Sequence, residues 1–78
     1  MIIIDTDKTA KVIKDKIKQT GIKNDDLSEM ICVSVPGIYK WFQGRSLPTI
    51  DNLVKIADIC GCTINDLIVT EEVVDVRL

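Results

Sequence analysis

Residues 23–48 read KNDDLSEMICVSVPGIYKWFQGRSLP, and this stretch decides how the chain folds. Its second half carries the signals of a short helix. Ser34 is a preferred N-cap, because its hydroxyl can accept one of the backbone N–H groups that the first turn leaves unpaired. Pro36 falls in that first turn, where a missing N–H is tolerated. Gly44 lies where a left-handed C-terminal stop is expected, so the sequence predicts a helix over residues 35–43.

Two apolar faces with helical spacing lie on either side of a short connection. The apolar residues are Leu27, Met30 and Ile31 upstream, and Ile38, Trp41 and Phe42 downstream. Helices this short cannot bury their apolar faces alone, so the two must pack together across a sharp turn near residues 32–33. This layout is a helix-turn-helix, whose second helix can be offered to the major groove of DNA. Because Trp41 shares a face with Ile38, we expect it to pack in the core rather than to stack on bases.

Helical spacing and capping residues predict three further helices. They cover about residues 7–20, 50–60 and 64–69. Their N-caps are expected at Thr6 or Asp7, at Thr49, and at Thr63 with Asp66 three positions on. The helix before the turn covers residues 24–31, with capping assigned to Asn24.

Both ends of the chain depart from helical spacing. Residues 1–4 (MIII) and 73–78 (VVDVRL) are rich in β-branched side chains, which favour strands. We expect them to pair as a small antiparallel ribbon, either within one chain or across a dimer. An isolated two-stranded ribbon is marginal in water, so this ribbon would need packing support.

Residues 27–68 read LSEMICVSVPGIYKWFQGRSLPTIDNLVKIADICGCTINDLI, and several of them recur in a familiar order and spacing. The matching elements are Leu27, Val33–Ser34, Ile38, Trp41, Gly44, Pro48, Leu53, Ile56–Ala57, Gly61 and Asp66–Leu67, with Ile13 and Gly21 upstream. This pattern resembles the Cro/repressor (XRE) family of bacterial and phage helix-turn-helix regulators, and the match covers roughly residues 9–69.

The resemblance implies an all-α, five-helix, lambda-repressor-like DNA-binding domain. We expect a single domain over residues 1–78, with a helical core at about 7–69 and terminal extensions at 1–6 and 70–78. A chain of 78 residues is indeed short enough to form one domain.

The net charge of −2 is distributed unevenly. Residues 1–45 carry eight Lys or Arg against six Asp or Glu, whereas residues 46–78 carry two against six. Positive charge therefore lies on the half that holds the predicted DNA-reading helix. Local sign matters more than the total, because attraction to phosphate fades beyond a Debye length of ~10 Å.

Other functional classes find little support in the sequence. The three cysteines (Cys32, Cys60 and Cys62) are too few for a disulfide framework, and their number is odd. Zinc usually takes four ligands, and this chain has no histidine to complete such a set. We therefore expect no metal, no cofactor and no small-molecule ligand, with Cys60 and Cys62 acting as small hydrophobes. Cys32 falls at the turn, where the family commonly carries glycine.

No catalytic constellation can be assembled from a chain without histidine, a glycine-rich phosphate loop or clustered carboxylates, so no enzyme is expected. The run at residues 2–4 is far too short for a membrane span or a signal peptide. We expect a cytoplasmic protein without membrane association.

The resemblance implies that the first residues of the reading helix, and one residue further along its outer face, reach the edges of bases. The base-contacting candidates are Val35, Pro36, Gly37 and Lys40. Val35 and Pro36 have only apolar surface to offer, for example to thymine methyls, whereas Lys40 can donate to guanine O6 and N7. The phosphate-contacting candidates are Lys23, Asn24, Tyr39, Gln43, Arg45 and Ser46.

Two functional hypotheses follow. The leading one is a sequence-specific transcriptional regulator, a small repressor that binds double-stranded DNA as a homodimer on half-sites one helical turn, ~34–36 Å, apart. Its dimer-interface candidates are Leu67, Ile68, Val69, Val73 and Val74. The alternative keeps the fold as a protein-binding module (an antirepressor, antitoxin-like partner or adaptor) with weak or no DNA binding. The acidic balance and the apolar reading positions favour this alternative, whereas Lys40, Arg45 and the basic first helix favour DNA.

Overall fold

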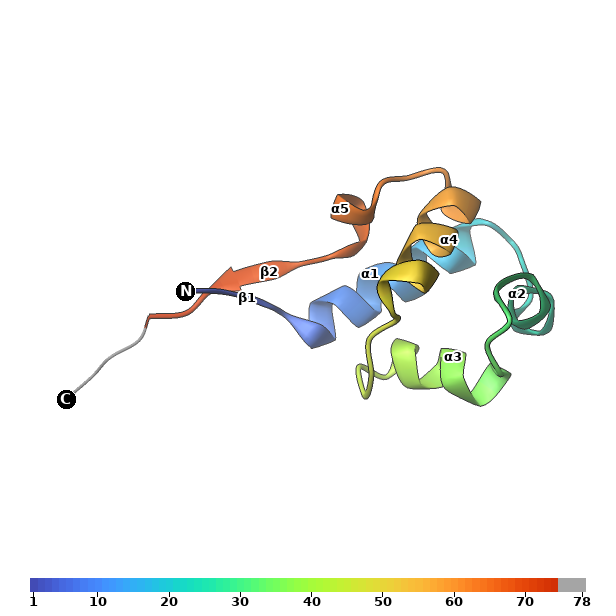
Figure 1. The fold of residues 1–78 in the computed structure, drawn as a ribbon, viewed down its shortest axis with the longest axis horizontal. Helices are drawn as coiled ribbons and strands as arrows, with labels where there is room; N and C mark the ends of the chain where they lie inside the picture. Colours follow the sequence, from blue (N-terminus) through green and yellow to red (C-terminus); the bar gives the residue numbers. More distant parts are fainter. Residues whose placement is uncertain (75–78) are drawn as a thin grey trace.

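A computed structural model describes residues 1–74 as five helices and a two-stranded antiparallel sheet (Figure 1). In chain order the elements are β1 (Ile2–Ile4), α1 (Thr6–Gln19), α2 (Asn24–Ile31), α3 (Val35–Phe42), α4 (Ile50–Cys60), α5 (Ile64–Leu67) and β2 (Thr70–Glu72). This architecture confirms the expected five-helix domain with a small terminal ribbon. Among the described residues no helix is long and apolar enough to cross a membrane.

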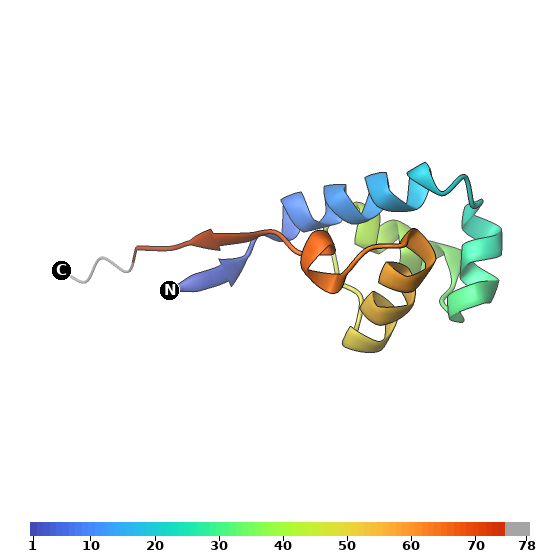
Figure 2. The same cartoon turned by 90° about the horizontal axis from the view of Figure 1, so that it is seen from above.

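The five helices form one body, and the ribbon extends from one end of it (Figures 1 and 2). The molecule measures 50 × 24 × 20 Å along its principal axes. Helix α1 is the central element, because it contacts α3, α4 and α5. Helices α2 and α3 cross steeply, so that α2 is seen almost end on where α3 lies in the plane of Figure 1.

The core is a single apolar cluster to which all five helices contribute. Its buried members are Ile13, Ile17, Leu27, Ile31, Ile38, Trp41, Leu53, Ile56, Ala57 and Leu67. Cys60 and Cys62 pack against this cluster as small hydrophobes. Met30 does not join the apolar face predicted for its helix: its side chain is 54 % exposed, because α2 meets the core only along Leu27 and Ile31.

Two helix starts differ from the sequence prediction. Helix α1 begins at Thr6 because Asp5, rather than Thr6 or Asp7, is its cap: the Asp5 carboxylate accepts the Lys8 N–H at 3.0 Å. Asn24 is already the first helical residue of α2 and does not cap it. Lys23 holds the cap position and makes no side-chain capping bond, so the first turn of α2 relies on Asp25 and Asp26 to complement its partial positive charge.

The caps of the two last helices agree with the sequence. The Thr49 hydroxyl accepts the Asn52 N–H at the start of α4. Thr63 and Asp66 form a reciprocal capping box, and the hydrogen bonds from Thr63 hold the pKa of Asp66 below its ordinary value. Helix α5 ends at Leu67, two residues earlier than predicted, because Ile68 is extended and leads into β2.

The turn between α2 and α3 passes through Cys32, which adopts the left-handed conformation with φ of 58°. Its N–H donates to the carbonyl of Ser28 and so ends α2. A Cβ is disfavoured in this region of backbone space, which explains why glycine is the expected residue at this position.

The ribbon was expected either within one chain or across a dimer, and the structure forms it within one chain. Ile2 lies opposite Glu72, Ile3 opposite Glu71 and Ile4 opposite Thr70. The second strand is therefore Thr70–Glu72, upstream of the predicted residues 73–78. Within that stretch, Val73 donates its N–H to the Met1 carbonyl at 2.8 Å, and residues 75–78 lie outside the described residues.

Thr9 fixes where the second strand begins. Its buried hydroxyl accepts the Val69 N–H at 2.9 Å and donates to the Val69 carbonyl at 3.3 Å. The Asp5 N–H donates to the same carbonyl at 2.8 Å. The root of the ribbon is thus tied to the first turns of α1, which supplies the packing support that a two-stranded ribbon needs.

Replacing Cys32 by glycine should stabilise the fold. A non-glycine residue in the left-handed region costs roughly 1–2 kcal/mol. Glycine removes this cost, but its greater backbone freedom stabilises the unfolded chain and offsets part of the gain. We therefore expect the free energy of unfolding to rise by about 0.5–1 kcal/mol. Urea unfolding measures this gain. The matched control is Cys32→Ala, which removes the thiol but keeps the Cβ; a glycine variant no more stable than the alanine variant would refute the strain.

Replacing Thr9 by valine should destabilise the chain by about 1–3 kcal/mol, because valine keeps the shape of the side chain while the half-buried Val69 N–H loses its acceptor. Thermal unfolding followed by circular dichroism measures the effect. Thr6→Val, at an exposed position of the same helix, is the control and should be nearly neutral. Equal stability of the two variants would mean that Thr9 does not tether the ribbon.

Candidate nucleic-acid interface

Helix α3 has one buried face and one open face. Ile38 is fully buried and Trp41 is 6 % exposed, which confirms that Trp41 belongs to the core. The exposed residues of α3 and its C-cap are Pro36, Tyr39, Lys40 and Gln43. Their spacing of i, i+3, i+4 and i+7 places them in one stripe along the helix. All four side chains of this outer stripe are exposed to solvent, and α3 itself lies along the lower edge of the helical body in Figure 1.

The start of α3 is locked by a cap and a close packing contact. The Ser34 hydroxyl accepts the Gly37 N–H at 3.2 Å, and the Ser34 carbonyl accepts the Ile38 N–H at 3.1 Å. A Cβ on Gly37 would lie 3.0 Å from Val33 Cγ1 and 3.3 Å from Ser34 Oγ. Gly37 therefore allows the turn at Val33 and Ser34 to pack closely against the start of α3. A glycine inside a helical pattern often has such a packing role. Val35 and Gly37 are half-buried, and Pro36 is exposed.

A tight loop follows α3 and returns the chain over its last turn. The Arg45 N–H donates to the Lys40 carbonyl at 3.0 Å, and the Gly44 N–H to the Trp41 carbonyl at 3.1 Å. Gly44 has φ of +72°, and a Cβ there would lie 3.0 Å from the Asp7 carboxylate. Arg45 and Ser46 are exposed directly after this turn, so Lys40 and Arg45 are offered from the same end of α3.

The position of Asp7 was not predicted from the sequence. Its carboxylate lies 3.0 Å from the position of a Cβ on Gly44, the residue that directly precedes Arg45. No local pattern could have indicated this, because the two residues come from α1 and from the loop after α3 and meet only through tertiary packing.

Tyr39 is positioned by its neighbour in the helix. Its ring meets the Phe42 ring edge to face, with centroids 6.2 Å apart and planes at 88°. The arrangement is a favourable one for aromatic pairs. Phe42 packs against the core, so it restrains a Tyr39 side chain that remains about half exposed.

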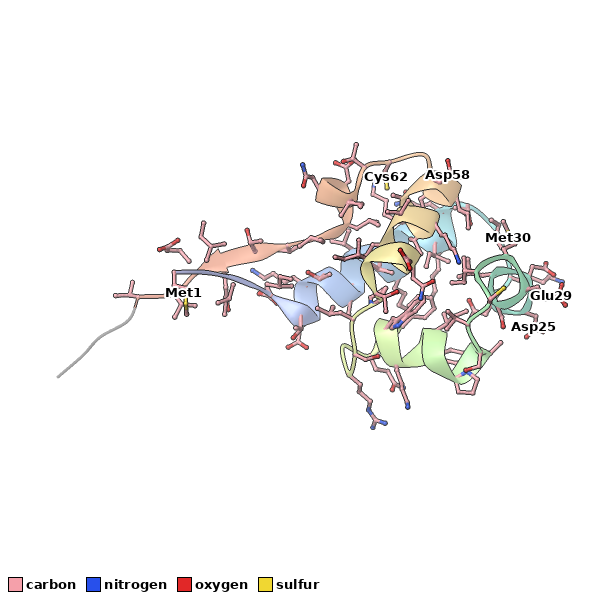
Figure 3. All side chains as sticks on the ribbon, viewed as in Figure 1. Met1, Asp25, Glu29, Met30, Asp58 and Cys62 are labelled. Carbon is pink, nitrogen blue, oxygen red and sulfur yellow. The ribbon has the colours of Figure 1, made fainter. Side chains whose placement is uncertain are left out.

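The remaining phosphate candidates lie at the start of α2. Lys23 is exposed and Asn24 is half-buried. Asp25 and Asp26 follow in the same turn and reduce the positive potential there. Figure 3 shows Asp25 and Glu29 on α2, at the end of the molecule away from the ribbon.

Within residues 1–74, one ion pair is formed, between the Met1 amino group and Glu72. Lys40 and Arg45 therefore have no carboxylate partner among the described residues. Their charges are available to an external anion.

The dimer-interface candidates occupy different environments. Leu67 is fully buried in the monomer core, so it has no side-chain surface to offer a second copy. Ile68, Val69 and Val73 are half-buried, and Val74 is exposed.

Two hollows lie outside the helix-turn-helix. An apolar one of about 220 Å³ lies at the foot of the ribbon, lined by Ile4, Thr9, Leu47, Pro48, Ile50, Leu53 and Ile68. An open depression of about 500 Å³ includes Lys16, Cys60 and Cys62. Burial and the neighbouring Cys62 raise the pKa of the Cys60 thiol. The described residues contain no group of three or more side chains suited to hold a metal ion.

A comparison with protein families supports the architecture. The family described as helix-turn-helix, of the XRE type, matches residues 13–67, which is more than half of the chain. Comparisons with curated proteins and with solved structures gave no match.

The cap of α3 can be tested by replacing Ser34 with alanine. We expect a loss of ~1 kcal/mol in the free energy of unfolding, because the Gly37 N–H loses its acceptor. Chemical denaturation gives the value, and Ser46→Ala, at an exposed loop position, serves as the control. A Ser34 variant as stable as the Ser46 variant would show that the hydroxyl does not hold the start of the helix.

Proposed function

The chain belongs to the Cro/repressor-type (XRE) helix-turn-helix family of DNA-binding regulators, and from this premise we propose that it is a sequence-specific repressor whose helix α3 enters the major groove. The observation that carries the proposal is the outer stripe of α3. The stripe is exposed to solvent, it includes Lys40, and it ends close to Arg45 in the sequence; neither cation has a carboxylate partner among residues 1–74.

Base contacts come from the leading edge and the middle of α3. Lys40 is the one cation on the stripe, and its ammonium group suits guanine O6 and N7. Pro36 and the half-buried Val35 suit thymine methyl groups. Gly37 has no side chain to offer, and the position of a Cβ there faces Val33 and Ser34, so only its backbone is available to a base. This set provides few hydrogen bonds to bases, so we expect modest discrimination between sequences.

Phosphate contacts flank these positions and fix the orientation of the protein on the duplex. We assign the first of them to Arg45, supported by Ser46 and Gln43 at the same end of α3. Tyr39 can donate its hydroxyl from a ring held by Phe42. Lys23 and Asn24 add contacts from the start of α2, weakened by Asp25 and Asp26.

The functional unit is a homodimer in this proposal. Two copies related by a twofold axis would read a pseudo-palindromic site with half-sites separated by one helical turn or a multiple of it. Ile68, Val69, Val73 and Val74 remain candidates for its interface, and Leu67 does not.

A second candidate function is a helix-turn-helix that binds a protein partner. The observations that favour it are the net charge of −2 and the lack of hydrogen-bonding side chains at Val35 and Pro36. The experiment below separates the two functions.

Binding to a mixed-sequence duplex should weaken linearly with salt on a log–log plot, because phosphate contacts release counterions. Lys40→Ala and Arg45→Ala should each flatten the slope by ~0.9, the share of one phosphate, if their charges contact the backbone. A Lys40 variant that instead loses preference between duplexes without a change in slope would assign that lysine to a base.

The control is Lys55→Ala, which removes a charge of the same sign from an exposed position on α4. Fluorescence anisotropy of a labelled duplex measures all four proteins. No binding at low salt, or equal slopes for the three variants, would contradict the proposal and favour the protein-binding function.

A further inference from the structure

The geometry points to a second copy of this chain as the partner of the ribbon: we propose that two molecules pair antiparallel along the free edge of β1, giving a four-stranded sheet with β1 strands at its centre. This inference specifies how the homodimer of the proposed function would form, and it places the interface on β1 rather than on Ile68, Val69, Val73 and Val74. It does not depend on DNA, and its test needs none.

The backbone of β1 has donors and acceptors left over on one edge. Met1 pairs with Val73, and Asp5 with Val69, through hydrogen bonds of 2.8 to 3.0 Å. In an antiparallel ladder, bonded residues alternate with residues whose N–H and C=O groups point the other way. By this alternation, Met1, Ile3 and Asp5 direct their backbone groups towards the second strand, and the N–H and C=O groups of Ile2 and Ile4 face outward.

The side chains of β1 are apolar and exposed. Ile2 is 69 % exposed, Ile4 43 % and Ile3 37 %. An edge strand that carries no charge, proline or bulge is a ready template for pairing with another chain. Burying these three isoleucines is therefore the main gain of association.

The edge of β2 is protected against the same pairing. Glu71 and Glu72 occupy two of its three positions, so a second β2 brought alongside would face like charges. We therefore place the self-pairing edge on β1, because β1 carries no charged side chain whereas β2 carries two glutamates, and because the backbone groups of Ile2 and Ile4 point outward.

One register of the two β1 strands gives hydrogen-bond partners to the outward N–H and C=O groups of both Ile2 and Ile4. With Ile3 opposite Ile3 of the second copy, Ile2 of each chain bonds Ile4 of the other, which makes four hydrogen bonds around the twofold axis. The two Ile3 side chains then meet directly at the axis, where cross-strand neighbours are closest.

The surroundings of the ribbon agree with such a dimer. Two strands alone are marginal, whereas four with an apolar face are more stable. Ile4 of β1 also lines the apolar hollow at the foot of the ribbon, and Ile50, which lines the same hollow, is exposed. Apolar surface therefore continues from the proposed dimer interface onto the helical body. The ribbon lies at one end of the molecule, which leaves the outer stripe of α3 uncovered (Figures 1 and 2).

Sedimentation velocity over a range of protein concentrations tests the proposal. The unmodified chain should dimerise reversibly. Ile3→Lys should weaken dimerisation by about tenfold or more, because two ammonium groups meet at the axis. Within its own chain this lysine faces Glu71, a favourable pair, so the ribbon is kept. Mixing Ile3→Lys with Ile3→Glu should restore association as a heterodimer, which a general loss of folding could not do.

Proline substitutions test the edge itself. Ile2→Pro removes an outward N–H of β1 and should also weaken dimerisation by about tenfold or more. Thr70→Pro removes the corresponding outward N–H of β2, and it should leave the dimer unchanged. Circular dichroism confirms that each variant is folded.

A monomeric unmodified chain at every concentration, an Ile3→Lys variant that dimerises like it, or a loss confined to Thr70→Pro would overturn the proposal. Each of these results is obtained without DNA. The salt-dependent binding of duplex described above can therefore succeed or fail independently.

Discussion

The contact of Ile38 and Trp41 with the shared apolar cluster is the interaction on which the rest of the molecule depends. It holds a helix of only eight residues, too short to be stable alone, against the remaining helices. Since the inner face is fixed in this way, the opposite stripe of Pro36, Tyr39 and Lys40 must face solvent. The orientation of the surface proposed to meet DNA is thus a consequence of core packing.

The surroundings of that surface are electrostatically mixed. Lys40 and Arg45 emerge together at one end of α3, while Asp7 lies beside Gly44 and acidic residues line the start of α2. Attraction to a duplex therefore depends on a few local cations rather than on a basic face, which agrees with a chain of net charge −2. In the proposed function, apolar Val35 and Pro36 offer only methyl contacts, so hydrogen bonds from the stripe to bases rest mainly on Lys40.

Features set by neighbouring residues could be predicted from the sequence. Ser34, Thr49 and Thr63 each cap a helix three residues before the N–H that they accept, and the spacing of Ile38 and Trp41 identifies the buried face of α3. Met30 has the same helical spacing as Leu27 and Ile31, yet its side chain is exposed. Helical periodicity identifies an apolar face, but it does not show how much of that face another helix will cover. The second strand was misplaced because its start depends on the bond between Thr9 and Val69, which are 60 residues apart. Leu67 was assigned to a dimer surface because the sequence could not show that α5 turns it into the core.

The central claim is that α3 presents its outer stripe to a duplex while its inner face stays in the core. The most direct measurement is the amide chemical shift of each residue during titration of the labelled protein with a short duplex at low salt. We expect the largest changes between residues 34 and 46, with smaller ones at Lys23 and Asn24. The buried amides of α4 and α5 should hardly move. Changes concentrated on α4, α5 or the ribbon, with residues 34–46 unaffected, would contradict it.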